Sequence, residues 1–587
     1  MIIYLQYNQI YNDDPLTWDE IMSFCSDWDK NLFLESLCTV NILLWASTFN
    51  TGILVDINLQ QKLIYTFFTP NEANTILDIA KKNNSIIIHR QQILLLIKSL
   101  LLSTPKTISK VKIPTENMHE VGKVLLSINQ LIENDTTSKI ELPEEVKKER
   151  RRRFMARNWY FNYNYMNKYR SRIARSIIIW NHIPKTKQGK ESLSHLKLKI
   201  DKEFKQQTSL TINEYIGLGM SLLSTYITLN ITIVKPKDFL INKENYFSQI
   251  KLDNKKTHKI FEELILDRNA YSKQNKDFIK NHLDNKDNWD YNFLPLEDKP
   301  LLYINNDFII PIDIEFLLKK VTYGIYWILL NKFKQIENPK LGKGRDLSQY
   351  YGYLVEGYVF ELFRLIYPNI IILPKENTKK TADFIIKVDY NGKVYALIIE
   401  SKKISLKYKT LIISDEKSTL EDLDRVFGKE NGLIQIYETI NRFKDNTLKG
   451  IDFTIQDIDE IIPILITDKP LPEDQSNRDF YERNFFHKYK SSIYLPKQFI
   501  HEQILLSLDD LEVLQAACDE NKSSSIFIQY ILDRSKKIKD NLENNTLNRI
   551  ESVSNELYEL GYKEYENKYL EKSFDKFYNN FANKLFN

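Results

Sequence analysis

The stretch that most constrains this chain is DFIIKVDYNGKVYALIIESK, residues 383–402. Two apolar runs flank Asn391-Gly392, the dipeptide that most strongly predicts a two-residue β-hairpin with a type I′ turn. Such a turn fixes the register of the two strands, and the count sets Asp383 directly opposite Glu400. The other pairs predicted on this count are Tyr390 with Lys393, Val388 with Tyr395, Ile386 with Leu397 and Ile385 with Ile398.

The two opposed carboxylates predict a metal site. Directly opposed residues of antiparallel strands have Cβ atoms roughly 5 Å apart on one face of the sheet, so Asp383 and Glu400 would repel each other. A divalent cation between them would remove that repulsion. Side chains repeat every second residue along a strand, so Lys402 should project beside Glu400 while Ser401 points away. The hairpin is therefore expected to hold two acids and an amine around a metal ion.

An Asp that opens one strand and a Glu-x-Lys that closes the next resemble the PD-(D/E)XK nuclease superfamily. Its restriction-endonuclease-like core runs helix, three strands, helix, strand, and the resemblance covers only the C-terminal half of this chain. Residues 369–373 (NIIIL) and 461–467 (IIPILIT) would supply the first and last strands of that order. Thr381-Ala382 stands where the family usually has a Pro before the first acid, a departure that the family tolerates.

The resemblance implies further site residues. A Glu of the first helix often joins the metal in this family, and Glu356 lies in line with Phe360 and Phe363 at helical spacing, on the face expected to pack inward. The alternative is a half-buried Glu paired with a basic residue. The family often has a Gln on its second helix, and Gln435 fits that position. The Tyr that usually follows lies only two residues on, at Tyr437, and its role stays open.

The resemblance also implies metal-assisted hydrolysis of phosphodiester bonds, with DNA preferred to RNA. Asp383, Glu400 and Glu356 would bind Mg²⁺ or Mn²⁺, Gln435 would complete the catalytic set, and Lys402 would orient or deprotonate the attacking water. A long helical region joined to such a nuclease resembles prokaryotic anti-phage defence proteins. Two alternatives stay open: a DNA repair or recombination nuclease that acts on junctions or ends, and an inactive scaffold that only binds nucleic acid.

A second stretch, residues 147–175, is rich in basic and aromatic side chains. It carries eleven Lys or Arg residues against one acid, Glu149. Basic groups neutralise phosphates and aromatic faces stack on unpaired bases, so the stretch is a candidate nucleic-acid interface. An equally weighted alternative is a helix with Arg on its solvent face and aromatics in the core, or a solvated linker. The residues predicted to bind nucleic acid are Arg150, Arg151, Arg152, Arg153, Arg157 and Trp159.

Composition favours an α+β protein of several folded, largely helical domains. The chain has 587 residues, of which 43% are hydrophobic and only 15 are Gly and 17 Pro. The predicted divisions are a helical region for sensing, regulation or nucleic-acid binding at 1–235, a connecting helical segment with a small hairpin at 236–340, the nuclease domain with its αβββαβ core at 341–500, and C-terminal helices at 501–587.

The remaining features predict a cytoplasmic protein that does not enter the membrane. Three cysteines are too few for a disulfide framework or a zinc cage, and no signal peptide opens the chain. The uncharged stretches 36–55 and 216–234 are diluted by polar residues and favour buried helices. A net charge of +4 means that nucleic acid must be bound by local patches. A regulatory protein or a second copy of the chain is a further candidate partner.

Overall fold

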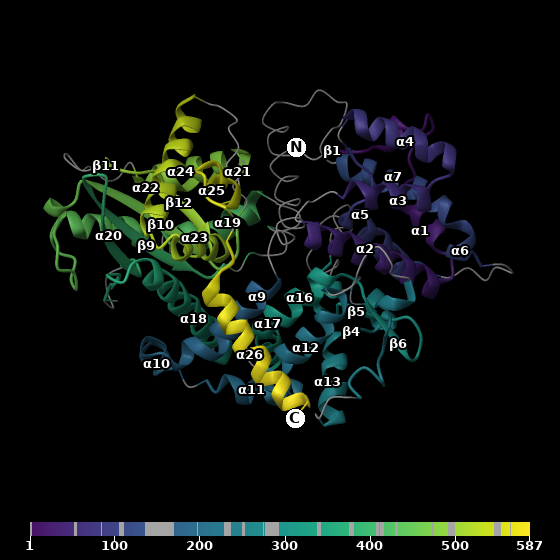
Figure 1. Cartoon of the computed structure of the whole chain (residues 1–587), viewed down its shortest axis with the longest axis horizontal. Helices are drawn as coiled ribbons and strands as arrows, with labels where there is room; N and C mark the ends of the chain where they lie inside the picture. Colours follow the sequence, from purple (N-terminus) through teal and green to yellow (C-terminus); the bar gives the residue numbers. More distant parts are fainter. Residues whose placement is uncertain are drawn as a thin grey trace.

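Helices dominate the architecture, and three β-sheets lie among them within the described residues (Figure 1). The computed structural model describes residues 3–51, 56–83, 85–104, 111–134, 169–196, 198–227, 236–248, 253–273, 275, 293–336, 342–374, 381–404, 406, 410, 416–428, 432–471, 475–490, 499–544, 553–563 and 565–586. The predicted mixture of helices and strands is thereby confirmed.

The N-terminal part is an assembly of helices around the strongly apolar segment of residues 90–102. This helix, α5, is buried along almost its whole length, because it packs against α1, α2 and α7. The short strand β1 (Ile3–Tyr4) pairs in parallel with β2 (Ser85–Ile86). The helices are α1 (Trp18–Cys25), α2 (Lys30–Thr51), α3 (Ile57–Phe67), α4 (Pro70–Asn83), α5 (Arg90–Leu102), α6 (Pro114–Asn117) and α7 (Val121–Asn134).

The middle of the chain contains the predicted small hairpin and a bundle of helices. Strands β5 (Leu301–Tyr303) and β6 (Phe308–Pro311) pair antiparallel, which confirms that hairpin, and β3 (Ile241–Asn242) and β4 (Ile265–Leu266) complete a four-stranded sheet. The helices are α9 (Tyr169–Ile177), α10 (Lys187–Leu193), α11 (Ile200–Thr208), α12 (Ile212–Ile227), α13 (Asn254–Leu264), α15 (Leu294–Asp298), α16 (Ile314–Thr322) and α17 (Gly324–Ile336).

A six-stranded sheet carries the hairpin of residues 383–402. The chain runs through α18 (Lys343–Ile366), β7 (Ile371–Ile372), β8 (Phe384–Tyr390), β9 (Lys393–Lys402), α19 (Glu416–Phe427), α20 (Leu433–Lys444) and β10 (Glu460–Thr467). Strands β7, β8 and β9 pair antiparallel, and β10 pairs in parallel with β9. Helix, three strands, helix and strand therefore follow one another in the expected order, with α19 as an addition.

Each face of this sheet is buried in a different core, since apolar residues of β8 and β9 point to both sides. Phe384, Ile386, Leu397 and Ile399 belong to a core shared with α18. Ile385, Ala396 and Ile398 belong to a second core, which is shared with α20. Alternation along β9 therefore assigns Glu400 and Lys402 to the α20 face of the sheet.

The six-stranded sheet extends past the predicted boundary at residue 500. Strands β11 (Phe499–Ile500) and β12 (Ile504–Ser507) both pair with β10, so a boundary after residue 500 cuts through the sheet. The larger hydrophobic core is continuous from Leu5 to Phe574. The C-terminal helices are α23 (Leu508–Glu520), α24 (Ser525–Asn544), α25 (Val553–Glu559) and α26 (Lys568–Phe586). Helix α26 returns across the molecule to pack against α9 (Figure 1).

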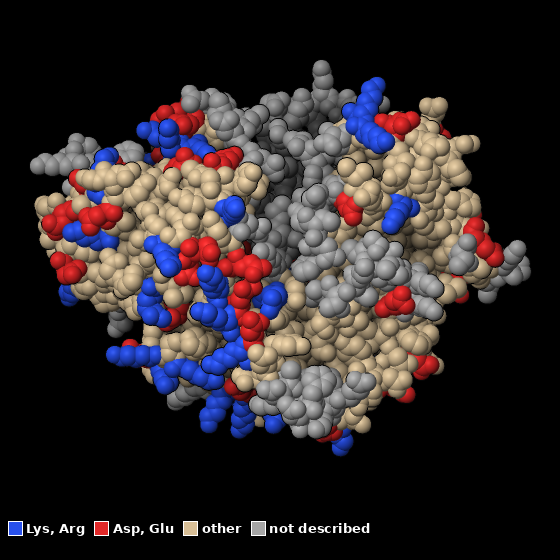
Figure 2. Space-filling model, in the orientation of Figure 1, with Lys and Arg blue, Asp and Glu red and all other residues tan. Residues whose placement is uncertain are grey.

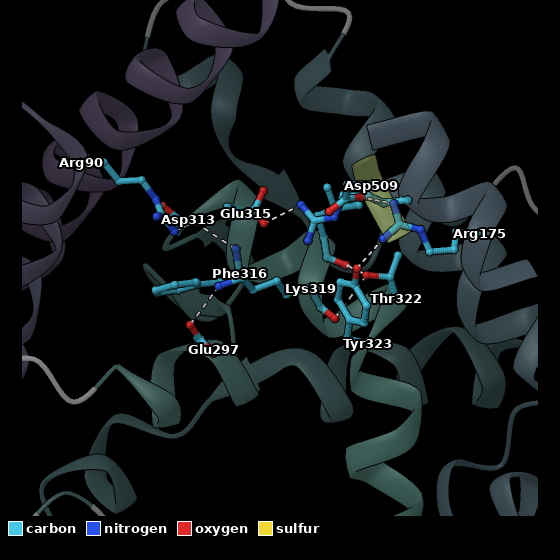
Figure 3. A network of polar contacts seen from close by, with 12 residues as sticks. Arg90, Arg175, Glu297, Asp313, Glu315, Phe316, Lys319, Thr322, Tyr323 and Asp509 are labelled. Carbon is cyan, nitrogen blue, oxygen red and sulfur yellow. Dashed lines mark hydrogen bonds and ion pairs between the residues drawn. The ribbon is translucent and has the colours of Figure 1, made fainter. Parts of the chain in front are cut away.

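A chain of buried ion pairs links these parts (Figure 3). Arg90 of α5 binds Asp313, the N-cap of α16, through Nε and Nη2 at 2.6 and 2.7 Å. Arg172 of α9 binds Glu315 at 2.5 Å. Because these charges are fully removed from water, their pairing holds α5, α9 and α16 in one arrangement.

Arg175, one helical turn beyond Arg172, connects α9 to the C-terminal half. Its guanidinium contacts Asp509 and binds Glu512 through two bonds of 2.6 and 2.7 Å, and it donates to the Tyr323 hydroxyl at 2.8 Å. The hydroxyl of Tyr358 on α18 also donates to Glu512, at 2.6 Å. Tyr358 follows Glu356 by two residues. Glu512 therefore ties this part of α18 to Arg175 of α9 in the helical region.

Among the described residues, no helix has the length and apolar character needed to cross a membrane. Helices α2 and α12 occupy most of the two uncharged stretches, and the described side chains in both are largely buried, as expected.

Candidate active site

The predicted hairpin register is confirmed pair by pair. Tyr390 lies opposite Lys393, Val388 opposite Tyr395, Ile386 opposite Leu397 and Ile385 opposite Ile398. Asn391 and Gly392 both have positive φ values, 49° and 75°, as a type I′ turn requires. The ladder ends at Phe384 and Ile399, so Asp383 and Glu400 come directly after its last pair.

Asp383 is bound by the residue that follows Glu400. Its Oδ2 accepts hydrogen bonds from the Ser401 backbone N–H at 2.8 Å and from the Ser401 hydroxyl at 2.7 Å. The expectation that Ser401 points away from the site is therefore wrong. Asp383 lies beyond the last ladder pair, where alternation no longer fixes its direction, and its carboxylate reaches Ser401. The side chains of Asp383 and Glu400 are both buried, with 2% and 1% exposed.

Lys402 lies beside Glu400, as predicted from the two-residue period. Its Nζ is 2.6 Å from Glu400 Oε1 and donates to Gln435 Oε1 at 2.6 Å. Its side chain is 20% exposed, so the ammonium group connects the buried acids to solvent. Strand β9 and helix α20 thus bring Lys402, Glu400 and Gln435 together.

Helix α20 orients Gln435 and also anchors the start of β8. Gln435 Nε2 donates to the Thr381 carbonyl at 3.1 Å, and this bond directs Oε1 toward Lys402. Thr439, one turn along, accepts from the Ala382 backbone N–H at 2.7 Å. Arg442 donates to the Thr381 hydroxyl at 2.7 Å. The helix holds the two residues before Asp383 through three side chains.

Glu356 is buried on α18, as predicted, but it does not join the acid pair in a ligand cluster. It lines a cavity of about 650 Å³ with residues of α10 and β7, and neither Asp383 nor Glu400 lines that cavity. Among the described residues, no group of three or more His, Cys, Asp or Glu side chains has an arrangement that could hold a metal ion. Helix α18 packs on the face of the sheet opposite to the one that alternation assigns to Glu400 and Lys402.

Tyr437 has no place at this site. Its side chain is buried in the core between α20 and the sheet, and burial raises the pKa of its hydroxyl. The departure from the family spacing therefore corresponds to a core residue.

Residues 169–175, the described part of the basic stretch, use their arginines in ion pairs within the protein. Arg172 and Arg175 are buried in ion pairs, and Arg170 pairs with Asp575 of α26 at 2.7 Å. On the face shown in Figure 2, the coloured Lys and Arg side chains are mixed with Asp and Glu along α26. The predicted nucleic-acid contacts Arg150, Arg151, Arg152, Arg153, Arg157 and Trp159 lie outside the described residues.

Sequence reasoning missed Lys403, the residue after Lys402. Alternation turns it to the opposite face of the sheet, where its Nζ lies 3.5 Å from the centroid of the Tyr326 ring and donates to the Ser348 hydroxyl at 3.3 Å. Burial lowers the pKa of Lys403 to about 7. The sequence shows a second lysine directly after Lys402, but it could not show that Tyr326, far earlier in the chain, lies against Lys403.

Because the pKa of Lys403 is lowered on folding, the free energy of unfolding should rise with pH. Between about pH 7 and pH 10 the unfolded chain keeps the Lys403 proton and the folded chain releases it, so the folded state gains stability as pH rises. Relative to Lys403→Met, the wild type should gain unfolding free energy between pH 7 and pH 9, by at most about 1.4 kcal/mol per pH unit. Urea unfolding of both proteins at several pH values measures this. A difference that stays constant across the range would contradict the expectation.

The carboxylate oxygens of Asp383 and Glu400 are suitable ligands for a hard divalent cation. Asp383 and Glu400 supply carboxylate oxygens, the ligands that Mg²⁺ and Mn²⁺ prefer, and Mg²⁺ usually binds through one or two carboxylates while water and phosphate complete its shell. The Lys402 ammonium already provides positive charge at Glu400 Oε1. Two buried carboxylates, one before β8 and one near the end of β9, are therefore compatible with a metal that also contacts a substrate phosphate.

Comparison with known proteins assigns the chain to no family. No protein-family model, no curated protein and no solved structure matches the chain.

Proposed function

We propose that this protein is a metal-dependent nuclease that hydrolyses phosphodiester bonds. The observation that carries the proposal is the meeting of Asp383, Glu400, Lys402 and Gln435 at one end of the β8–β9 hairpin. An acid pair with an adjacent ammonium is the combination expected in a restriction-endonuclease-like site. The order of helices and strands from α18 to β10 supports the same family assignment.

Asp383 and Glu400 would hold Mg²⁺ or Mn²⁺, which supplies Lewis-acid polarisation of the scissile phosphate when bound. Lys402 would position the attacking water and offset negative charge that develops on phosphorus. Gln435 would keep the Lys402 ammonium in place through its 2.6 Å bond. Glu356 would act through water, since it lines a cavity that neither Asp383 nor Glu400 lines.

We propose DNA rather than RNA as the substrate and prokaryotic defence in the cytoplasm as the role, because the resemblance favours both. A repair nuclease remains the second candidate within the same chemistry. Arg175 of α9 and Tyr358 of α18 both bind Glu512 of α23, and this shared buried acid supports a role for the helical region in controlling the site.

A cleavage assay tests the proposal directly. Plasmid, linear duplex and single-stranded DNA, and RNA of matched length, are incubated with the full chain in Mg²⁺, Mn²⁺ or EDTA. Cleavage of DNA in Mg²⁺ or Mn²⁺ and none in EDTA is the expected result. Cleavage that persists in EDTA, or no cleavage of any substrate in either metal, would overturn the proposal.

Lys402→Ala should lower cleavage strongly and leave metal affinity unchanged, because the ammonium acts on water and phosphate and contributes no ligand to the metal. Lys402→Arg should not restore full activity, since a planar guanidinium cannot replace a compact ammonium between Glu400 and Gln435. Calorimetric Mn²⁺ titration and cleavage rates measure the two effects separately. A collapse of Mn²⁺ binding in Lys402→Ala would show that Lys402 is structural.

A further inference from the structure

Two lysines follow the carboxyl ends of the parallel strands β9 and β10. Lys402 pairs with Thr467 in the last rung of this ladder, and the Asp468 N–H donates to the Lys402 carbonyl at 3.1 Å. Lys403 and Lys469 therefore leave the sheet next to each other, directly after the residues of the candidate site.

Both ammonium groups lie against aromatic rings. Lys403 Nζ is 3.5 Å from the Tyr326 centroid, and Lys469 Nζ is 5.9 Å from the centroids of both Tyr323 and Trp327. Within the part of the chain that the structure describes, no carboxylate lies within ion-pair distance of either ammonium. Asp468 attracts both, but it is buried and its Oδ1 accepts the Ile404 N–H at 2.6 Å.

Trp327 gives this edge an exposed aromatic face. On α17, the Trp327 side chain is 38% exposed, whereas its neighbour Tyr326 is buried. Helix α16 ends at Thr322 and α17 begins at Gly324, so Trp327 lies in the first turn of α17. An indole in contact with solvent, beside an ammonium without an ion-pair partner among the described residues, suits a ligand that has both flat rings and negative charge.

We propose that Trp327 and Lys469, supported by Lys403, form a platform that binds single-stranded nucleic acid at the end of the sheet that also holds the acid pair, on the face covered by α17 and α18. An unpaired base stacks on the indole, and Lys469 contacts the adjacent phosphate. Stacking of this kind needs a base face free of pairing partners, which favours single strands over duplex. The platform rests on the proposed nuclease function and deepens it, because it names the form of substrate delivered to the site.

Fluorescence anisotropy with a labelled oligo(dT) of about 15 nucleotides, comparable to the site sizes of known single-strand binders, tests the platform in EDTA, where binding is separate from cleavage. Trp327→Ala should raise the Kd about tenfold. Lys469→Gln should weaken binding and reduce the slope of log K against log salt by about 0.7. The matched controls are Tyr558→Ala, an aromatic with 76% exposure on α25, and Lys62→Gln, an exposed lysine on α3. Both controls should leave the Kd unchanged.

The outcomes separate the platform from the nuclease function. Unchanged oligo(dT) affinity in both Trp327→Ala and Lys469→Gln overturns the platform, even if the wild type cleaves DNA. A wild type that binds neither oligo(dT) nor oligo(U) also overturns it, and would point to a protein partner at this edge. Weakened binding in the two variants with unchanged melting temperatures supports the platform, even if no cleavage occurs in any metal. If Trp327→Ala unfolds, Lys469→Gln alone decides.

Discussion

Asp383→Asn and Glu400→Gln should each lower the rate of metal-dependent cleavage by more than about 100-fold, because the loss of a mere outer-shell partner of a metal site already costs 10–100-fold. Both variants should fold. The amide oxygen in Asp383→Asn can still accept the two Ser401 hydrogen bonds, and the amide in Glu400→Gln keeps the shape of the buried side chain. Cleavage rates on the preferred substrate and Mn²⁺ titration by calorimetry measure the effect.

Asp389→Asn is the matched control, since Asp389 is an exposed acid on the same hairpin. It should cleave at the wild-type rate. Normal cleavage by either Asp383→Asn or Glu400→Gln would remove the acid pair from the mechanism, and equal Mn²⁺ affinity in all three variants would show that the pair is not a metal site.

Arg175→Met should destabilise the folded state by about 3–5 kcal/mol, because removal of one member of a buried ion cluster leaves the others without compensation. Asp509 and Glu512 would lose their guanidinium partner in a region closed to solvent. Arg170→Met is the control on the same helix. Its pair with Asp575 is exposed, so the change should cost less than about 1 kcal/mol.

Urea or thermal unfolding of both variants measures the difference. Equal stability losses in Arg175→Met and Arg170→Met would show that the cluster contributes no more than a surface pair does. A smaller loss at position 175 would mean that α9 and α23 adjust to keep the acids hydrated.

The parts of the site that follow local rules could be predicted from the sequence. The Asn-Gly turn fixed the register, and the two-residue period placed Lys402 beside Glu400. Gln435 was found by its position on a helix between two strands. The hairpin neighbours lie within about one rung of each other, and Gln435 comes from α20, which packs on β9.

The parts that failed depend on contacts between distant elements. Whether Glu356 reaches the acid pair depends on which face of the sheet α18 covers, and helical periodicity contains no information on that. Arg172 and Arg175 stood in a run that suggested solvent or phosphate contact, yet their partners come more than 140 and 330 residues later. The surroundings of Lys403 and Trp327 likewise arise from the packing of α17 and α18 against the strand ends.

The ion pair between Arg175 and Glu512 of α23 also affects when the parts of the protein can assemble during synthesis. The ribosome produces α9 early, but Glu512 follows Arg175 by 337 residues, and strand β12 is made after β10. Until those residues emerge, Arg175 lacks its acidic partners and β10 has β9 on one side but no strand on the other. The nascent chain therefore carries every residue of the candidate site well before the surroundings that hold α18 against the sheet exist, and assembly of the site is a late event in synthesis.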